Sequence, residues 1–222
     1  MNNLFQRIIT SLILLFILSI SLLINKYIWL FGLIICSLVL FIEFNNLTKK
    51  ICKKKKSTLA SANIFSILFL IVLIFVGYEI YSKSLISLLF IIFICIFSDT
   101  GGYLVGNLIG GRKLTKISPK KTISGSIGSF IFSLIPILIF WIYFHNTQDW
   151  NFRIDGYFKL IPVCLFLCLI CQLGDLFISY FKRKANVNDT GTILPGHGGL
   201  LDRIDGVIFV LPAAYITDKI FF

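Results

Sequence analysis

The chain is organised as long apolar runs separated by short polar stretches. Seven of these runs reach roughly 18–22 residues, the length that an α-helix needs to cross a hydrocarbon core of ~30 Å. They lie at 5–24, 28–47, 59–80, 84–104, 124–144, 158–178 and 204–222. The pattern predicts an all-α, polytopic integral membrane protein of about seven transmembrane helices.

Composition excludes an ordinary soluble domain. Of the 222 residues, 57% are hydrophobic and 14% are charged, and the mean hydropathy is +0.92. An average soluble domain has about 45–50% apolar and about 25% charged residues. The first apolar run is followed by no small-residue cleavage site, so we interpret it as a retained helix rather than a signal peptide.

The six cysteines do not indicate a metal or redox site. Cys168 and Cys171 have the spacing CxxC, but they lie inside an apolar run and no histidine stands beside them. Cysteines in such surroundings usually behave as small hydrophobic side chains. We therefore expect them to be buried without a chemical role.

Basic residues fall mainly on one side of the predicted membrane. With the N-terminus inside, sixteen Lys and Arg lie in cytoplasmic segments and five lie on the opposite side, which accounts for all 21. Cytoplasmic segments of membrane proteins carry this excess. The net charge of +11 is then explained by topology and by attraction of the basic run 49–56 to anionic lipid headgroups. We expect no nucleic-acid partner.

One polar loop combines glycine, lysine and hydroxyl residues. Its three parts are 98–103 (SDTGGY), 110–114 (GGRKL) and 118–122 (SPKKT). Glycines let backbone N–H groups approach an anion, and Lys120 and Lys121 supply positive charge. Thr122 stands where the next helix begins, and a helix start favours phosphate. The loop indicates phosphate binding, with an ordinary basic topogenic loop as the alternative.

A second polar loop places carboxylates at the ends of two apolar runs. Asp175 closes one run, where a carboxylate is costly unless it is paired or bound to a metal. Asp202 and Asp205 have i, i+3 spacing, so a helical start would put both on one face. Together with Asp99 of the first loop, these oxygen ligands suit Mg²⁺, which takes one or two carboxylates plus substrate phosphates.

The second loop also contains cations and one histidine. The cations placed to neutralise phosphate oxygens beside a metal are Lys182, Arg183 and Arg203. The alternative is a loop of satisfied ion pairs, such as Asp202 with Arg203 or Lys184. His197 lies between glycines and fits a phosphate or nucleotide contact, a proton shuttle or a turn residue. We favour the phosphate or nucleotide contact.

These motifs together resemble one family. Residues 179–205 read S-Y-F-K-R-x5-D-x5-P-G-H-G-G-L-x-D-R-I-D, which is similar to the signature of the phosphatidate cytidylyltransferase (CDP-diacylglycerol synthase) family. The resemblance extends over 98–206, with its upstream elements in the same order. Asn188 stands where the family usually has lysine, and Ser124 where it commonly has glutamate or glutamine. Glu43 is similar in position to an acidic residue of the family.

The resemblance implies a CTP-dependent nucleotidyltransferase of phospholipid biosynthesis. Such an enzyme transfers CMP from CTP to phosphatidate, giving CDP-diacylglycerol and pyrophosphate, with its active site on the cytoplasmic face of the bacterial inner membrane. It also implies Mg²⁺, a monovalent cation such as K⁺, and a homodimer. N-terminal transmembrane helices (1–97) would precede a catalytic transmembrane region (98–222) that carries both loops.

The expected site residues follow from the two loops and the resemblance. The catalytic residues are Asp175, Asp202, Asp205, Lys182, Arg183 and Arg203. The substrate-binding residues are Ser118, Lys120, Lys121, Thr122, Ser179 and His197. The metal ligands are Asp175, Asp202 and Asp99. Because the attacking phosphate is already an anion, catalysis needs positioning and charge neutralisation rather than a strong base.

Two other functions are compatible with parts of the pattern. A related CTP-dependent polyprenol or phytol kinase would transfer the γ-phosphoryl group instead, but Ser179, Lys182 and Arg183 favour the cytidylyltransferase. A transporter of a phosphorylated solute would place charges near the membrane midplane and show repeated halves. Here the charges lie at the ends of the apolar runs. The products formed from CTP and lipid distinguish the three functions.

Overall fold

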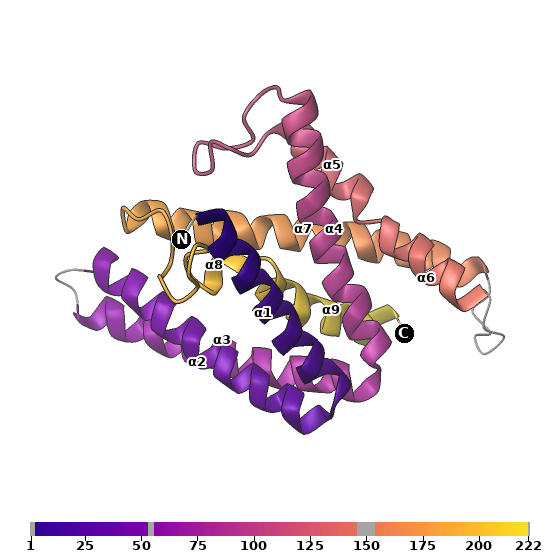
Figure 1. The fold of residues 1–222 in the computed structure, drawn as a ribbon, viewed down its shortest axis with the longest axis horizontal. Coiled ribbons are helices and arrows are strands. Elements are labelled where there is room, and N and C mark those ends of the chain that lie inside the picture. The colour runs from indigo at the N-terminus through magenta and orange to yellow at the C-terminus, as the bar shows by residue number, and fades with distance from the viewer. Residues whose placement is uncertain (1–2, 53–55, 146–153, 222) are drawn as a thin grey trace. The chain divides into compact units, whose positions relative to one another are not determined.

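Every regular element in the part of the chain that the structure describes is a helix. The computed structural model describes residues 3–52, 56–145 and 154–221 (Figure 1). The helices are α1 (Asn3–Leu23), α2 (Lys26–Ile51), α3 (Lys56–Lys83), α4 (Leu85–Ile109), α5 (Ile123–Phe132), α6 (Ile135–His145), α7 (Ile154–Lys184), α8 (Leu201–Ile204) and α9 (Val207–Phe221). The predicted all-α class is confirmed.

Six segments of the described residues are long and apolar enough to cross a membrane. They are Phe5–Leu23, Lys26–Ile51, Lys56–Lys83, Leu85–Ile109, Ile123–Ile142 and Lys159–Lys184. These segments correspond to the first six predicted runs. The last run, 204–222, lies mainly in the 15-residue α9, which is shorter than the ~20 residues of a membrane-spanning helix. The fold is that of a polytopic membrane protein.

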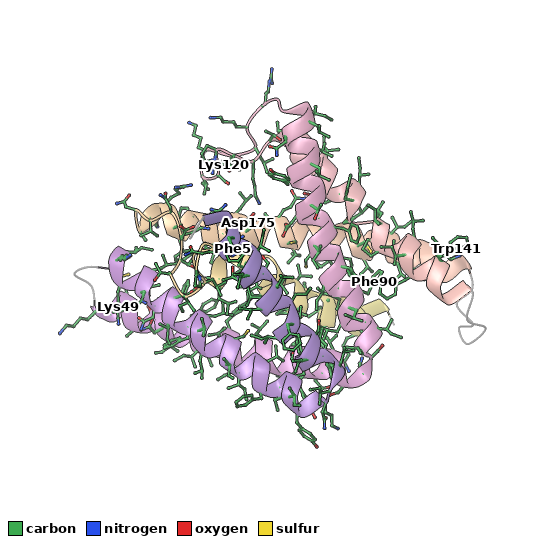
Figure 2. The ribbon with its side chains drawn as sticks, in the orientation of Figure 1. Phe5, Lys49, Phe90, Lys120, Trp141 and Asp175 are labelled. Carbon is green, nitrogen blue, oxygen red and sulfur yellow. The ribbon has the colours of Figure 1, made fainter. Side chains whose placement is uncertain are left out.

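Large apolar side chains cover the outside of these helices. Phe5 on α1 is 53% exposed and Trp141 on α6 is 42% exposed (Figure 2). Leu108, near the end of α4, is 84% exposed. Water-soluble proteins rarely expose contiguous apolar surface on this scale. Lipid hydrocarbon is the solvent that suits such a surface.

A proline divides the predicted run 124–144 into two helices. α5 ends at Phe132 and α6 begins at Ile135, immediately before Pro136. Because Pro136 has no N–H to donate to the preceding turn, the helical hydrogen-bond pattern is interrupted there. The hydroxyl of Ser133 donates to the carbonyl of Phe130 at 2.7 Å and satisfies one acceptor at the break.

The chain forms two compact units that do not follow chain order. Unit 1 consists of Met1–Leu85 and Ile178–Asp205, and unit 2 consists of Ile86–Phe177 and Gly206–Phe222. The segment with the second motif loop therefore packs with the N-terminal helices. The chain passes from one unit to the other at three points, 85/86, 177/178 and 205/206. The boundary expected between residues 97 and 98 follows the order of the motifs along the chain and stays a prediction.

Aromatic side chains join α1, α2 and α3 in unit 1. The indole N–H of Trp29 donates to the carbonyl of Gly77 at 2.9 Å, and the Trp29 ring stacks on Tyr81 with centroids 5.9 Å apart. The Tyr81 hydroxyl donates to the carbonyl of Leu22 at 2.8 Å. Buried indole N–H and phenol O–H groups require such partners. These contacts fix the three N-terminal helices to one another.

Helices α4 and α5 of unit 2 approach each other backbone to backbone. A Cβ atom on Gly128 would lie 2.5 Å from the Cβ of Val105 and 2.8 Å from the carbonyl oxygen of Gly101. A Cβ atom on Gly125 would lie 2.7 Å from the carbonyl oxygen of Gly102. Small residues permit such close contacts between membrane helices. The contact places the start of α5 against α4.

Candidate active site

A cavity of about 470 Å³ in unit 2 brings together residues from α4, α7, the start of α5 and the loop before α5. Its volume is within the range of about 300–1,000 Å³ that is usual for small-molecule sites. The lining residues are Asp99, Gly102, Tyr103, Gly106, Asn107, Leu114, Lys120, Lys121, Thr122, Gly125, Ser126, Ser129, Gln172 and Asp175. The first motif loop and Asp175 thus contribute to one cavity.

The loop between α4 and α5 is shaped by two glycines and a tight turn. Gly110 and Gly111 have φ of +64° and +104°, which side-chain-bearing residues rarely adopt. The N–H of Leu114 donates to the carbonyl of Lys121 at 2.8 Å, and the N–H of Lys121 donates to the carbonyl of Ser118 at 3.1 Å. The loop therefore turns back on itself, and its adjacent lysines reach the cavity wall.

The start of α5 forms part of the same wall. Thr122 is the N-cap residue, and its hydroxyl accepts a hydrogen bond from the N–H of Gly125 at 3.1 Å. The first N–H groups of a helix have no partner within the helix, and the helix dipole favours negative charge near them. Lys120 and Lys121 line the cavity beside this helix start. The wall suits phosphate oxygens.

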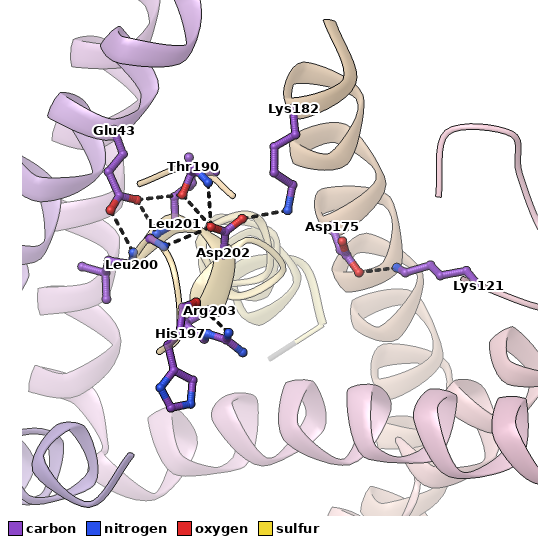
Figure 3. A network of polar contacts seen from close by, with 11 residues as sticks. Glu43, Lys121, Asp175, Lys182, Thr190, His197, Leu200, Leu201, Asp202 and Arg203 are labelled. Atoms are coloured by element: carbon purple, nitrogen blue, oxygen red, sulfur yellow. Dashed lines mark hydrogen bonds and ion pairs between the residues drawn. The ribbon is translucent and has the colours of Figure 1, made fainter. Parts of the chain in front are cut away.

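Two carboxylates line the cavity as well. Asp99 comes from α4 and Asp175 from α7, and Asp175 forms an ion pair with Lys121 (Figure 3). The hydroxyl of Ser126 donates to the side-chain oxygen of Gln172 at 2.5 Å. These carboxylate, hydroxyl and amide oxygens are hard donors, and Mg²⁺ typically takes one or two carboxylates with substrate phosphates. The lining residues therefore fit Mg²⁺.

The loop between α7 and α8 in unit 1 is built from two turns. Asn186 has φ of +53°, and the N–H groups of Asn186 and Val187 bond back to carbonyls of the last turn of α7. This is a common way to end a helix. Farther on, Pro195 and Gly196 occupy the centre of a turn that is closed by the N–H of His197, with φ of +75° at Gly196.

Asp202, in the first turn of α8, anchors this loop. Its Oδ1 accepts from the Lys182 ammonium at 2.7 Å (Figure 3). Its Oδ2 accepts from the N–H and hydroxyl of Thr190 at 2.7 and 2.9 Å and from the N–H of Gly199 at 3.1 Å. Burial acts to raise the pKa of Asp202, but the hydrogen bonds from Lys182 and Thr190 outweigh it and hold the pKa below its ordinary value.

The histidine of the second motif loop contacts α1. The Nδ1 atom of His197 lies 2.6 Å from the hydroxyl of Thr10, and its Nε2 atom lies 3.3 Å from that of Ser11. Its carbonyl accepts from Arg203 at 2.7 Å. Burial, followed by the positive charges of Arg203 and Arg7, lowers the pKa of His197 below the ordinary 6.5. These surroundings favour the neutral imidazole over the charged form.

A buried carboxylate of α2 contacts the same loop. Glu43 is 1% exposed. It accepts hydrogen bonds from the N–H groups of Leu200 and Leu201 at 2.9 and 2.8 Å and from the hydroxyl of Thr190 at 3.0 Å (Figure 3). The second motif loop is thus attached to the N-terminal helices by α2 as well as by α1.

The predicted site residues fall into two groups. Unit 2 contains Asp99, Ser118, Lys120, Lys121, Thr122 and Asp175, and all of them except Ser118 line the cavity. Unit 1 contains Ser179, Lys182, Arg183, His197, Asp202, Arg203 and Asp205. Of the predicted metal ligands, Asp99 and Asp175 share the cavity, whereas Asp202 belongs to unit 1 and is paired with Lys182.

Metal binding at this cavity would depend on the substrate. Among the residues that the structure describes, no three His, Cys, Asp or Glu side chains form a group that could hold a metal ion by themselves. Asp99 and Asp175 supply two carboxylates to the cavity. Mg²⁺ commonly binds to proteins through one or two carboxylates, with phosphate oxygens and water as its other ligands. Two carboxylates would therefore need oxygen atoms from another molecule to complete such a site.

Three residues that shape these sites were not among the predicted site residues. Glu43 and Thr190 hold the second motif loop, and Gln172 lines the cavity. Gln172 and Glu43 each carry a polar group within or at the end of an apolar run, which is an unusual placement and a usable signal. Thr190 has no comparable signal, because it lies in a loop already rich in polar residues.

The fold and the cavity define a polytopic membrane protein with a cavity whose lining suits phosphate oxygens. A sequence model of the cytidylyltransferase family matches residues 48–221. The chain is also 34% identical over 222 residues to a phosphatidate cytidylyltransferase of Rickettsia typhi, which covers 96% of this chain and 91% of that protein. The chain belongs to the cytidylyltransferase family.

Matches to other relatives are closer in identity but shorter. Phosphatidate cytidylyltransferases of Staphylococcus aureus and Staphylococcus saprophyticus are 45% and 43% identical over 137 and 136 residues, which is 61% of this chain. These matches cover 50% of each staphylococcal protein. The chain therefore spans about half the length of these curated relatives.

Proposed function

We propose that this protein transfers CMP from CTP to phosphatidate, giving CDP-diacylglycerol and pyrophosphate. The observation that carries the proposal is the cavity of unit 2, where Asp99, Asp175, Lys121 and the start of α5 meet. Carboxylates, cations and a helix start are the groups that bind a nucleoside triphosphate together with its metal ion. Membership of the cytidylyltransferase family supports the same activity.

The cavity residues would act by positioning and by charge. Lys120, Lys121 and the first N–H groups of α5 bind the phosphate oxygens of CTP, and Thr122 holds that helix start in place. Asp99 and Asp175 would hold Mg²⁺, which supplies neutralisation of charge on the phosphates when bound. The lipid phosphate attacks the α-phosphorus of CTP, the bond to the β-phosphate oxygen breaks, and pyrophosphate leaves.

We also propose a role for the cations of the second motif loop. Lys182, Arg183 and Arg203 are proposed to bind phosphate oxygens, and Lys182 already forms an ion pair with Asp202. We further propose that the site faces the cytoplasm at the bacterial inner membrane, where phosphatidate arrives from the leaflet. A homodimer and a monovalent cation such as K⁺ beside Mg²⁺ complete the proposal.

The experiment follows the label from CTP into lipid. Protein purified in detergent is incubated with phosphatidate, Mg²⁺ and CTP labelled at either the α- or the γ-phosphate. We expect α-label in lipid, γ-label in pyrophosphate and no product in EDTA. Transfer of γ-label to lipid would identify a kinase, and no lipid product from metal-replete, well-folded protein would contradict the proposal.

A matched pair of variants tests the cavity itself. Asp175→Asn should reduce CMP transfer strongly, because it removes a carboxylate that lines the cavity and pairs with Lys121. Asp218→Asn makes the same chemical change in α9 at a residue that does not line the cavity, and it should leave the rate within a factor of about two. Equal rates for both variants would exclude the cavity as the site of reaction.

A further inference from the structure

Glu43 is a buried charged residue for which the proposed reaction has so far no use. Its three hydrogen-bond donors all come from the second motif loop, at Thr190, Leu200 and Leu201. A carboxylate is rarely buried unless it is paired or hydrogen-bonded, because loss of water otherwise destabilises the charged form. Two backbone N–H groups and a hydroxyl supply that compensation here. The position of the loop and the burial of the Glu43 carboxylate therefore depend on each other.

Thr190 connects this carboxylate to Asp202. Its hydroxyl lies 3.0 Å from Oε2 of Glu43 and 2.9 Å from Oδ2 of Asp202 (Figure 3). A hydroxyl has one proton, so it donates to one carboxylate at a time. The backbone N–H of Thr190 donates to Asp202 at 2.7 Å. One residue thus sets the spacing between the two carboxylates.

The loop backbone fits closely around Glu43. A Cβ atom on Gly191 would lie 2.6 Å from Oε1 of Glu43, and one on Gly199 would lie 2.6 Å from Oε2. Neither position has room for a side chain without displacing the carboxylate. Glycine at both positions lets the loop close over the end of α2, so the carboxylate acts as the centre around which residues 190–201 are arranged.

We propose that Glu43 is a positioning residue that holds the second motif loop, and with it Asp202 and Lys182, in the arrangement the reaction needs. The proposal rests on the function proposed above. Glu43 lies before residue 48, where the match to the family model begins. The N-terminal helices are accordingly part of the catalytic apparatus, because they supply the group that organises the loop, and are more than a membrane anchor.

The test compares the chain's only two glutamates. Glu43→Gln keeps the shape but places an NH₂ group where two N–H groups and a hydroxyl now donate, so at least one bond must be lost. Glu79→Gln makes the same change on α3, outside the loop contacts. CMP transfer is measured for both variants, and hydrogen–deuterium exchange is measured for the amides of residues 199–203, which include the two N–H groups bonded to Glu43.

In Glu43→Gln we expect the loop amides to exchange faster with solvent and kcat to fall about a hundredfold. A displacement of ~1 Å in a catalytic group can reduce a rate by about that factor. Glu79→Gln should change neither quantity. Unchanged exchange in Glu43→Gln would show that the contact is absent, and faster exchange with normal kcat would show that the loop position does not matter for catalysis. Either result overturns the proposal.

A second pair of variants separates positioning from a general loss of folding. Thr190→Val removes the bridging hydroxyl and should lower kcat, whereas Thr190→Ser keeps the hydroxyl and should restore it, at equal yields of monodisperse protein. A Thr190→Ser variant as impaired as Thr190→Val would contradict the role of the bridge. A further outcome is that the wild-type chain makes no CDP-diacylglycerol while Glu43→Gln still speeds exchange of the loop amides. That result would contradict the proposed function and, with it, the catalytic role of Glu43. It would still establish the contact between Glu43 and the loop.

Discussion

The carboxylate of Asp202 has four donors, and this number limits what else it can bind. Among the residues that the structure describes, three of these donors approach Oδ2, and Lys182 donates to Oδ1. Arg203, the neighbouring cation that the sequence offered as a partner, instead bonds to the carbonyl of His197. Because Lys182 is 20 residues away in the sequence, local spacing gives no indication of the observed pair.

Asp202→Asn should slow CMP transfer roughly a thousandfold, which corresponds to a loss of ~4 kcal/mol of transition-state stabilisation. The amide would turn an NH₂ group toward either Lys182 or the backbone donors and would remove the charge. A merely structural role for this largely buried pair would instead lower stability, by ~3–5 kcal/mol when one partner is lost, and would leave the turnover of the folded protein nearly unchanged. Initial rates at saturating CTP decide between these readings, and more than a tenth of wild-type turnover would refute a catalytic role for Asp202.

The pKa of His197 provides a test of its contact with α1. Its folded-state pKa is lowered, so the associated stabilisation is present above about 6.5 and is lost as pH falls through the folded-state pKa. Arg7→Gln removes one nearby positive charge and should raise the pKa of His197 partway toward 6.5, because burial and Arg203 still act on it. NMR titration of the imidazole measures this. The chain has two histidines, so His145→Gln assigns the signal, and an unchanged pKa would contradict the contact.

At the scale of single elements, local sequence signals predicted the helices, but they did not predict contacts between residues far apart in the sequence. Apolar runs located the helices, and Pro195-Gly196 is a sequence signature of the turn that forms there. Pro136 explains in retrospect why one predicted span became two helices. The bonds between Glu43 and Leu200 join residues 157 positions apart, and no periodicity records such a pairing.

The contact between α4 and α5 makes a sharp prediction for glycine. Gly128→Ala introduces a Cβ atom 2.5 Å from Val105 and 2.8 Å from a backbone oxygen, so the helices must separate. We expect a destabilisation of about 1–3 kcal/mol, measured as a lower Tm in detergent. Gly32→Ala is the matched control, because its Cβ would have only one neighbour within 4 Å, Ser21 at 3.8 Å, and α2 should accept it. Equal Tm values for the two variants would contradict the close approach.

On the scale of the whole molecule, the distribution of basic residues sets the orientation that the sequence predicts. The predicted cytoplasmic loops are 48–57, 105–123 and 183–201, and residues 53–55 of the first lie outside the described residues. The helices between these loops are confirmed, whereas the side of the membrane that each loop faces stays a prediction. This prediction of orientation rests on the charge asymmetry, because cytoplasmic segments of membrane proteins hold the excess of Lys and Arg.

Single cysteines introduced into a cysteine-free chain test this orientation in intact cells. Lys49→Cys, Arg112→Cys and Thr192→Cys should resist a membrane-impermeant maleimide until the cells are opened. Lys83→Cys, in the last turn of α3, should react from outside. Strong outside labelling at any of the first three positions would overturn the predicted topology.

The attachment of residues 190–201 to α2 also sets an order of events during synthesis. Glu43 and Leu200 are 157 residues apart, which at about 5–20 residues per second corresponds to roughly 8–30 seconds of translation. For that interval the N-terminal helices have entered the membrane while their carboxylate has none of its later donors. The nascent chain must keep this group in contact with water until the ribosome has made the loop. Completion of unit 1 is therefore one of the last steps in the biogenesis of the protein, although most of its helices are the first to be made.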